Sequence, residues 1–109
     1  MLFRSSLRDK LTELVDRHEE VGRLLGDAST ISDKDRFRDL SKEYARLDEV
    51  VHDFTAHREV EREIVAAEEL RNSDDAEMAS MADDELKELE QRRADLERRL
   101  LFQIGRAHV

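Results

Sequence analysis

The segment SDKDRFRDLSKEYARLDEVVHDFTAHREVEREIVAAEELRN, residues 32–72, decides the fold. Apolar residues recur in it at steps of three and four, which is the spacing of one face of an α-helix. They are Phe37, Leu40, Tyr44, Leu47, Val51 and Phe54, followed after a weaker turn by Val60, Ile64 and Ala67. Because no Gly or Pro interrupts the run, it predicts a helix over 33–71 that is roughly 60 Å long at 1.5 Å per residue. We expect the first six of these residues to face the core, and a rod of this length needs a partner along it.

Polar breaks on either side of this helix predict its ends. Ser32, with Asp35 three residues later, matches a capping box at its start. The stretch Asn72 to Asp75 predicts a turn in which Asp74 or Asp75 caps the next helix. That helix is predicted over 76–102, where the stripe consists of Leu86, Leu89, Leu96 and Leu100, with Arg93 interrupting it at the edge of the seam. Because the connection is short, the two helices should pack antiparallel.

The beginning of the chain predicts another helix, over 6–25, which Ser5 or Ser6 can cap. Its apolar stripe, on which His18 also lies, consists of Leu7, Leu11, Leu14, Val21 and Leu25. Gly26 offers a left-handed position to end the helix, and the segment GDASTIS that it opens is small and polar, which predicts a loop. The sequence therefore predicts an all-α fold, a three-helix bundle built on a long antiparallel helical hairpin.

Composition narrows the class of function. The 109 residues include 43% charged and 5% aromatic residues, no Pro and no Cys, and the formal net charge is −9. Such a chain repels phosphate backbones and anionic lipid, so we expect a protein partner, no direct nucleic-acid binding and no membrane association. The start of the chain has no apolar core of a signal peptide, and no stretch approaches the roughly 20 apolar residues of a membrane span. The expected location is the cytoplasm.

Catalytic, cofactor-binding and metal residues are not predicted anywhere in the chain. Among the four histidines, His52 and His57 are five residues apart and point to different helix faces, and His18 has no second histidine four residues later. Adjacent carboxylates, as in Glu19-Glu20 or Asp83-Asp84, diverge by about 100° on a helix. The three glycines are isolated, so no phosphate-binding loop is present. We expect no enzymatic activity and no cofactor.

The heptad-like stripes fit either an intramolecular core or a dimeric coiled coil. The two polar breaks favour the intramolecular hairpin and a monomer, because turns at these positions would interrupt the helices of a continuous coiled coil. A cytosolic coiled-coil scaffold or oligomerisation module remains the alternative.

Particular residues resemble a known family. The run from Arg17 to Val51 resembles the opening of bacterial peptide chain release factor 1, above all RFR at 36–38 and LSKEYA at 40–45. Later pieces also resemble it, namely EEL at 68–70, EMA at 77–79, DEL at 84–86 and LE at 89–90. The resemblance covers about residues 7–101. It implies the N-terminal helical domain of a factor that terminates translation at UAA and UAG codons and projects toward the stalk base of the large ribosomal subunit.

The same resemblance sets expectations about what this chain lacks. The family's codon-reading motif and its Gly-Gly-Gln hydrolysis motif do not occur in it, nor does the Leu-Pro-Lys-Asp segment that leads into the second domain. We therefore expect a fragment, with the release-factor domain at 1–102. The string IGRAHV, residues 104–109, resembles the in-frame translation of a common sequencing adapter, so 103–109 is expected to be a non-native tail.

Overall fold

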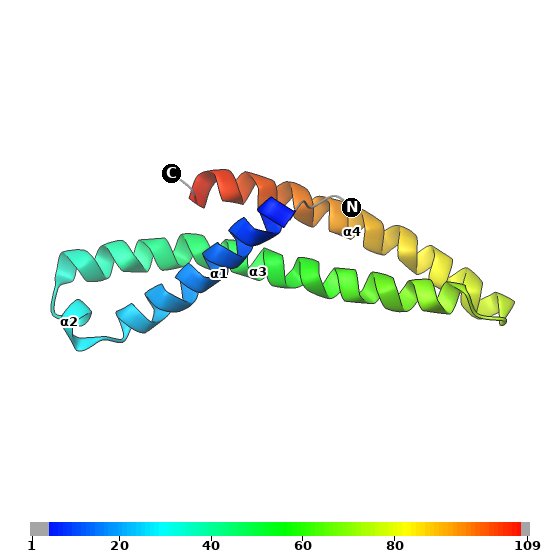
Figure 1. Cartoon of the computed structure of the whole chain (residues 1–109), viewed down its shortest axis with the longest axis horizontal. Coiled ribbons are helices and arrows are strands. Elements are labelled where there is room, and N and C mark those ends of the chain that lie inside the picture. The colour runs from blue at the N-terminus through cyan, green and yellow to red at the C-terminus, as the bar shows by residue number, and fades with distance from the viewer. Residues whose placement is uncertain (1–4, 108–109) are drawn as a thin grey trace.

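The protein is a rod of helices. A computed structural model describes residues 5–107, which form α1 (Ser5–Leu25), the short α2 (Ala28–Ile31), α3 (Lys34–Arg71) and α4 (Ala76–Ala107). The rod measures 63 × 24 × 19 Å. Its two ends are the turn between α3 and α4 and the segment around α2 (Figure 1). The all-α class and the long antiparallel hairpin are confirmed.

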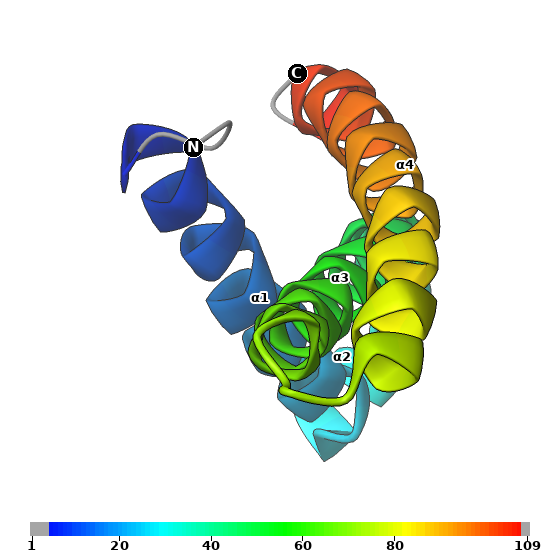
Figure 2. The same ribbon diagram turned by 90° about the vertical axis from the view of Figure 1, so that its right-hand side faces the viewer.

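Helix α3 is the axis on which the other helices pack. It contacts α4 along the hairpin and α1 over its N-terminal half. Viewed along the rod, α1 and α4 diverge from α3 on different sides (Figure 2). Two separate helices therefore cover α3, and its buried face is wider than the seam of a two-stranded coiled coil.

The structure corrects three local predictions near the first turn. Residues 28–31 form α2 instead of a loop, and Thr30 within it is completely buried. Ser32 ends α2, with its hydroxyl donating to the Ser29 carbonyl oxygen at 3.1 Å, so it does not cap α3. Asp33 caps α3 instead, since its Oδ1 accepts from the Arg36 amide at 3.1 Å. Gly26 does not have a positive φ, so its predicted left-handed conformation is wrong.

The remaining helix ends agree more closely with the sequence. Of the two predicted caps of α4, Asp74 and Asp75, the structure uses Asp75, because its Oδ1 accepts from the amides of Glu77 at 3.0 Å and Met78 at 3.2 Å. Helix α1 contains both Ser5 and Ser6, so Ser6 is not its cap, and the residues before Ser5 lie outside the described ones. Helix α4 runs through Gly105 to Ala107, so its predicted end at residue 102 is wrong, and 108–109 lie outside the described residues.

Apolar side chains form two separate clusters along the rod. The first joins all three long helices and consists of Leu11, Leu14, Val21, Leu40, Leu47, Val50, Phe54 and Leu100. The second lies within the hairpin and consists of Val60, Ile64, Ala67, Leu86, Leu89 and Leu96. Arg93, the residue that interrupts the predicted stripe, is half-buried.

The predicted core face of α3 is correct for Leu40, Leu47 and Phe54 but wrong at two positions. Phe37 is 39% exposed, and Val50 at 1% exposure takes the core place predicted for Val51, which is half-buried. Tyr44 is half-buried and packs against the first cluster. A helix with 3.6 residues per turn drifts away from a strict seven-residue repeat, and packing against α1 moves the buried face toward Val50.

Candidate interaction surface

The histidines and carboxylate pairs considered for chemistry do not converge. His52 is exposed and His57 is completely buried, so the structure separates them. Glu19, Glu20, Asp83 and Asp84 are all exposed. Over residues 5–107, no group of three His, Cys, Asp or Glu side chains is arranged to hold a metal ion. Within the same range no helix is long and apolar enough to cross a membrane.

His18 joins α1 to α3. Its ring stacks on that of Tyr44 with centroids 4.4 Å apart, and its Nε2 lies 3.0 Å from Asp48 Oδ1. A stacked and paired imidazole of this kind holds two helices together, and among the described residues it belongs to no group of three potential metal ligands.

Arg17 makes the second link between α1 and α3. Its Nε and Nη2 donate to the two carboxylate oxygens of Glu43 at 2.7 and 2.8 Å, and its Nη1 donates to Glu20 Oε1 at 2.6 Å. The hydrogen bonds from Arg17 hold the pKa of Glu43 below its ordinary value, and the bond to Glu43 raises the pKa of Arg17. The pair fixes α1 in one register on α3.

This pair predicts a dependence of stability on pH. A carboxyl group whose pKa is lowered in the folded chain stabilises the fold above its unfolded pKa, and that stabilisation disappears as pH falls through the lower folded pKa. The free energy of unfolding of the native chain should therefore exceed that of Glu43→Gln by up to about 1 kcal/mol at pH 7, with the difference vanishing in acid. Urea titrations at several pH values measure it, and Glu19→Gln controls for the change in net charge. A difference that stays constant down to the acid limit would contradict the assignment.

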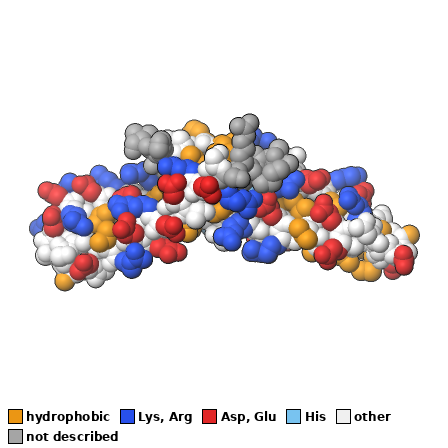
Figure 3. Space-filling model, viewed as in Figure 1, with side chains coloured by type: hydrophobic (Ala, Val, Ile, Leu, Met, Phe, Trp, Pro, Cys, Tyr) orange, Lys and Arg blue, Asp and Glu red, His pale blue; other side chains and the backbone are white. Residues whose placement is uncertain are grey.

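The turn between α3 and α4 exposes apolar side chains together with many acidic ones, which we call its acidic border. We call residues 65–85 the tip surface. Its exposed apolar side chains are Val65, Leu70, Met78 and Met81, of which Met81 is 67% exposed. Its acidic residues are Glu68, Glu69, Asp74, Asp75, Glu77, Asp83, Asp84 and Glu85, and its only Lys or Arg is Arg71. Figure 3 shows orange and red side chains together at this end of the rod.

The chemistry of the tip surface suits a protein partner. Exposed methionines are flexible and polarisable, which lets them fit a partner's apolar surface. The acidic border repels phosphate and attracts basic side chains. The sequence alone assigned no role to Met78 and Met81. Their position outside the leucine stripe of 86–100 was the available signal.

Comparison with known protein families identifies the family to which this chain belongs. The model of the PCRF domain matches residues 14–106, which include most of α1, all of α2 and α3, and nearly all of α4. The chain belongs to the PCRF domain family. This is a family of release factors, which act in translation termination. The match reaches into 103–109, and the expectation that this segment is non-native stays a prediction.

Family membership gives the hairpin its context. Within the PCRF domain, the residues that resembled release factor 1, RFR at 36–38 and LSKEYA at 40–45, fall in the first three turns of α3. Most of the charged residues among them stand on the outside of the rod, whereas Leu40 is buried and Tyr44 half-buried. The resemblance therefore rests on both core and surface positions.

Proposed function

We propose that this chain is the N-terminal helical domain of a bacterial peptide chain release factor 1, which serves termination at UAA and UAG codons in the cytoplasm. The observation that carries the proposal is the PCRF match over the whole hairpin, together with the block at 36–45. In this proposal the domain binds protein at the stalk base of the large ribosomal subunit. Codon reading and hydrolysis belong to motifs that the 109 residues do not contain.

The surface chemistry supports protein docking as the task of this domain. The net charge of −9 and the acidic border of the tip surface oppose contact with ribosomal RNA. A rigid hairpin with an adaptable apolar end can instead reach a basic protein surface and bind it without rearranging its own core. We therefore assign binding to the tip surface and no bond-breaking chemistry to any described residue.

A release assay tests the proposal that these 109 residues perform neither codon reading nor hydrolysis. The purified chain, as the only factor, should not release formyl-methionine from ribosomes programmed with a stop codon, since no glutamine of a Gly-Gly-Gln motif is present to position water. It should inhibit an intact factor only at large excess, because binding through one small surface is weak. An intact factor in the same assay is the positive control. Release above background by this chain alone would overturn the proposal.

The alternative, a coiled-coil scaffold, predicts a different oligomeric state. The observation that favours it is the exposure of two neighbouring apolar side chains on α4, Leu101 and Phe102, which a second copy of the chain could cover. Light scattering after size exclusion separates the two, because the release-factor domain should elute with the 12.8 kDa mass of one chain. A dimer of stable mass across dilution would favour the scaffold.

A further inference from the structure

A groove between α3 and α4 carries a separate cluster of charged side chains. It consists of two adjoining hollows of about 270 and 390 Å³ that share His52, Asp53 and Arg99. The first hollow is also lined by Ala56, Arg92, Asp95 and Leu96, and the second by Asp48, Glu49 and Gln103. The groove lies well away from the tip surface, near the opposite end of α4.

Asp53 is the unusual member of this groove. Its side chain is buried at 2% exposure, yet it is a carboxylate with four sites for hydrogen bonds. Oδ1 lies 3.2 Å from Arg99 Nη2, whereas Oδ2 is buried with no hydrogen-bond partner among the described residues. A buried carboxylate oxygen without a donor is costly, and native structures rarely leave one unexplained.

A second acceptor without a donor is Gln103, which lies one helical turn after Arg99 on α4. Gln103 Oε1 is buried and has no hydrogen-bond partner within residues 5–107. Because Gln103 follows Arg99 by four residues on α4, the two side chains share a helix face, and Gln103 lines the same hollow as Asp53. The groove thus offers two acceptors that need a ligand with more than one donor.

The charges of the groove identify the class of ligand. Its four carboxylates outnumber its two arginines, so it favours a cation. The described carboxylates and histidines hold no arrangement for a metal ion. An organic cation with several N–H donors fits better, and the planar guanidinium group presents five of them in a rigid fork.

We propose that this groove binds an arginine side chain of a protein partner. The guanidinium donates to Asp53 Oδ2 and Gln103 Oε1, and the aliphatic stem packs on Ala56 and Leu96. Arg99 is 63% exposed at its side chain and bonds only one oxygen of Asp53, so it leaves the second oxygen to the incoming group. The site adds a contact that the proposed function does not supply, and it stands whether or not the tip surface binds the ribosome.

The test uses N-acetyl-L-argininamide as the probe and ¹H–¹⁵N NMR spectra of the whole chain as the readout. We expect saturable shifts of amides in 48–56 and 95–103, with a Kd of about 1 to 10 mM, as suits one side chain in a shallow groove. The matched probe is N-acetyl-L-citrullinamide, which has nearly the same shape without the charge and should shift these amides little. Equal shifts with both probes, or shifts scattered over the chain, would overturn the proposal.

Two variants in the groove and one control variant locate the binding site. Asp53→Asn should weaken binding of the arginine probe at least about tenfold, because it removes the charge that the guanidinium meets. Asp39→Asn, on an exposed face of α3 outside both the groove and the tip surface, changes the net charge equally and should leave the Kd unaltered. Gln103→Leu serves if Asp53→Asn does not fold, and should weaken binding several-fold. Unchanged affinity in the folded groove variants would refute the site.

Discussion

Replacement of Glu97 by leucine should lower the free energy of unfolding by about 3 to 5 kcal/mol, although leucine suits the helix and is close in volume. Glu97 lies in the layer between the two apolar clusters, where its Oε2 is 2.9 Å from Nε2 of the completely buried His57. A carboxylate can only accept, so the geometry assigns the proton of this hydrogen bond to Nε2. Glu97→Leu removes this acceptor from the buried N–H.

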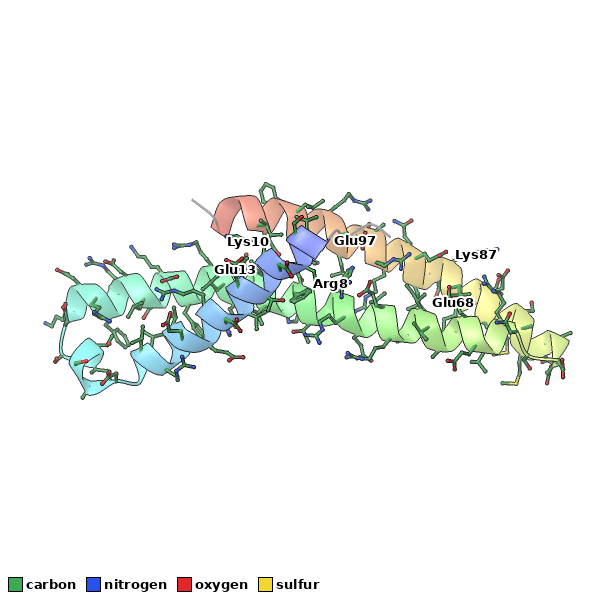
Figure 4. The ribbon with its side chains drawn as sticks, in the orientation of Figure 1. Arg8, Lys10, Glu13, Glu68, Lys87 and Glu97 are labelled. Carbon is green, nitrogen blue, oxygen red and sulfur yellow. The ribbon has the colours of Figure 1, made fainter. Side chains whose placement is uncertain are left out.

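The loss extends beyond one hydrogen bond because the pair belongs to a chain of contacts through three helices. His57 Nδ1 lies 3.6 Å from Glu61 Oε1, which lies 3.4 Å from Nη2 of Arg8 on α1. Figure 4 labels Arg8 and Glu97, the two ends of this chain of contacts. The layer therefore ties α1, α3 and α4 into one register, and loss of one acceptor from a buried polar network is costly.

Urea denaturation followed by circular dichroism at 222 nm measures the effect. Glu90→Leu is the matched control, since Glu90 is exposed on the same helix and its replacement should change stability by less than about 0.5 kcal/mol. The double variant His57→Leu with Glu97→Leu should recover most of the loss, because it removes both partners. If the double variant were no more stable than Glu97→Leu, the cost would come from packing and not from the lost hydrogen bond between His57 and Glu97.

Periodicity was sufficient to predict the long helices and their pairing. The polar breaks at 26–32 and 72–75 placed the turns, and the sequence limited the cap of α4 to Asp74 or Asp75, of which the structure uses Asp75. Ser32 was not predictable in the same way. The short helix α2 uses its hydroxyl and backbone, and four residues are too few to show a period.

Contacts between distant residues account for what the sequence did not show. His57 and Glu97 are 40 residues apart, and only the register of the hairpin brings them together. The same register places Asp53 against Arg99 and creates the groove around them. His57 was considered only as a metal ligand, because no local pattern marks a carboxylate that pairs with it across the turn. The tip surface, in contrast, follows from local sequence alone.

Leu47 and Val51 provide the sharpest test of the corrected face of α3. Leu47→Ala should destabilise the chain by about 2 to 5 kcal/mol, because Leu47 is 3% exposed in the cluster that joins α1, α3 and α4, and its loss leaves a cavity. Val51→Ala should cost less than about 1 kcal/mol, since this side chain is half-buried and its removal exposes no comparable void.

The comparison depends on both variants keeping the helical content of the native chain, which far-UV circular dichroism checks before the urea titration. Helix propensity favours alanine at both positions by at most about 0.7 kcal/mol, so it accounts for only a small part of the expected difference. Val50→Ala should resemble Leu47→Ala in sign, at a smaller size that reflects its smaller side chain. If Val51→Ala cost more than Val50→Ala, the buried face of α3 would follow the seven-residue repeat of the sequence and not the packing of α1 and α4 against it.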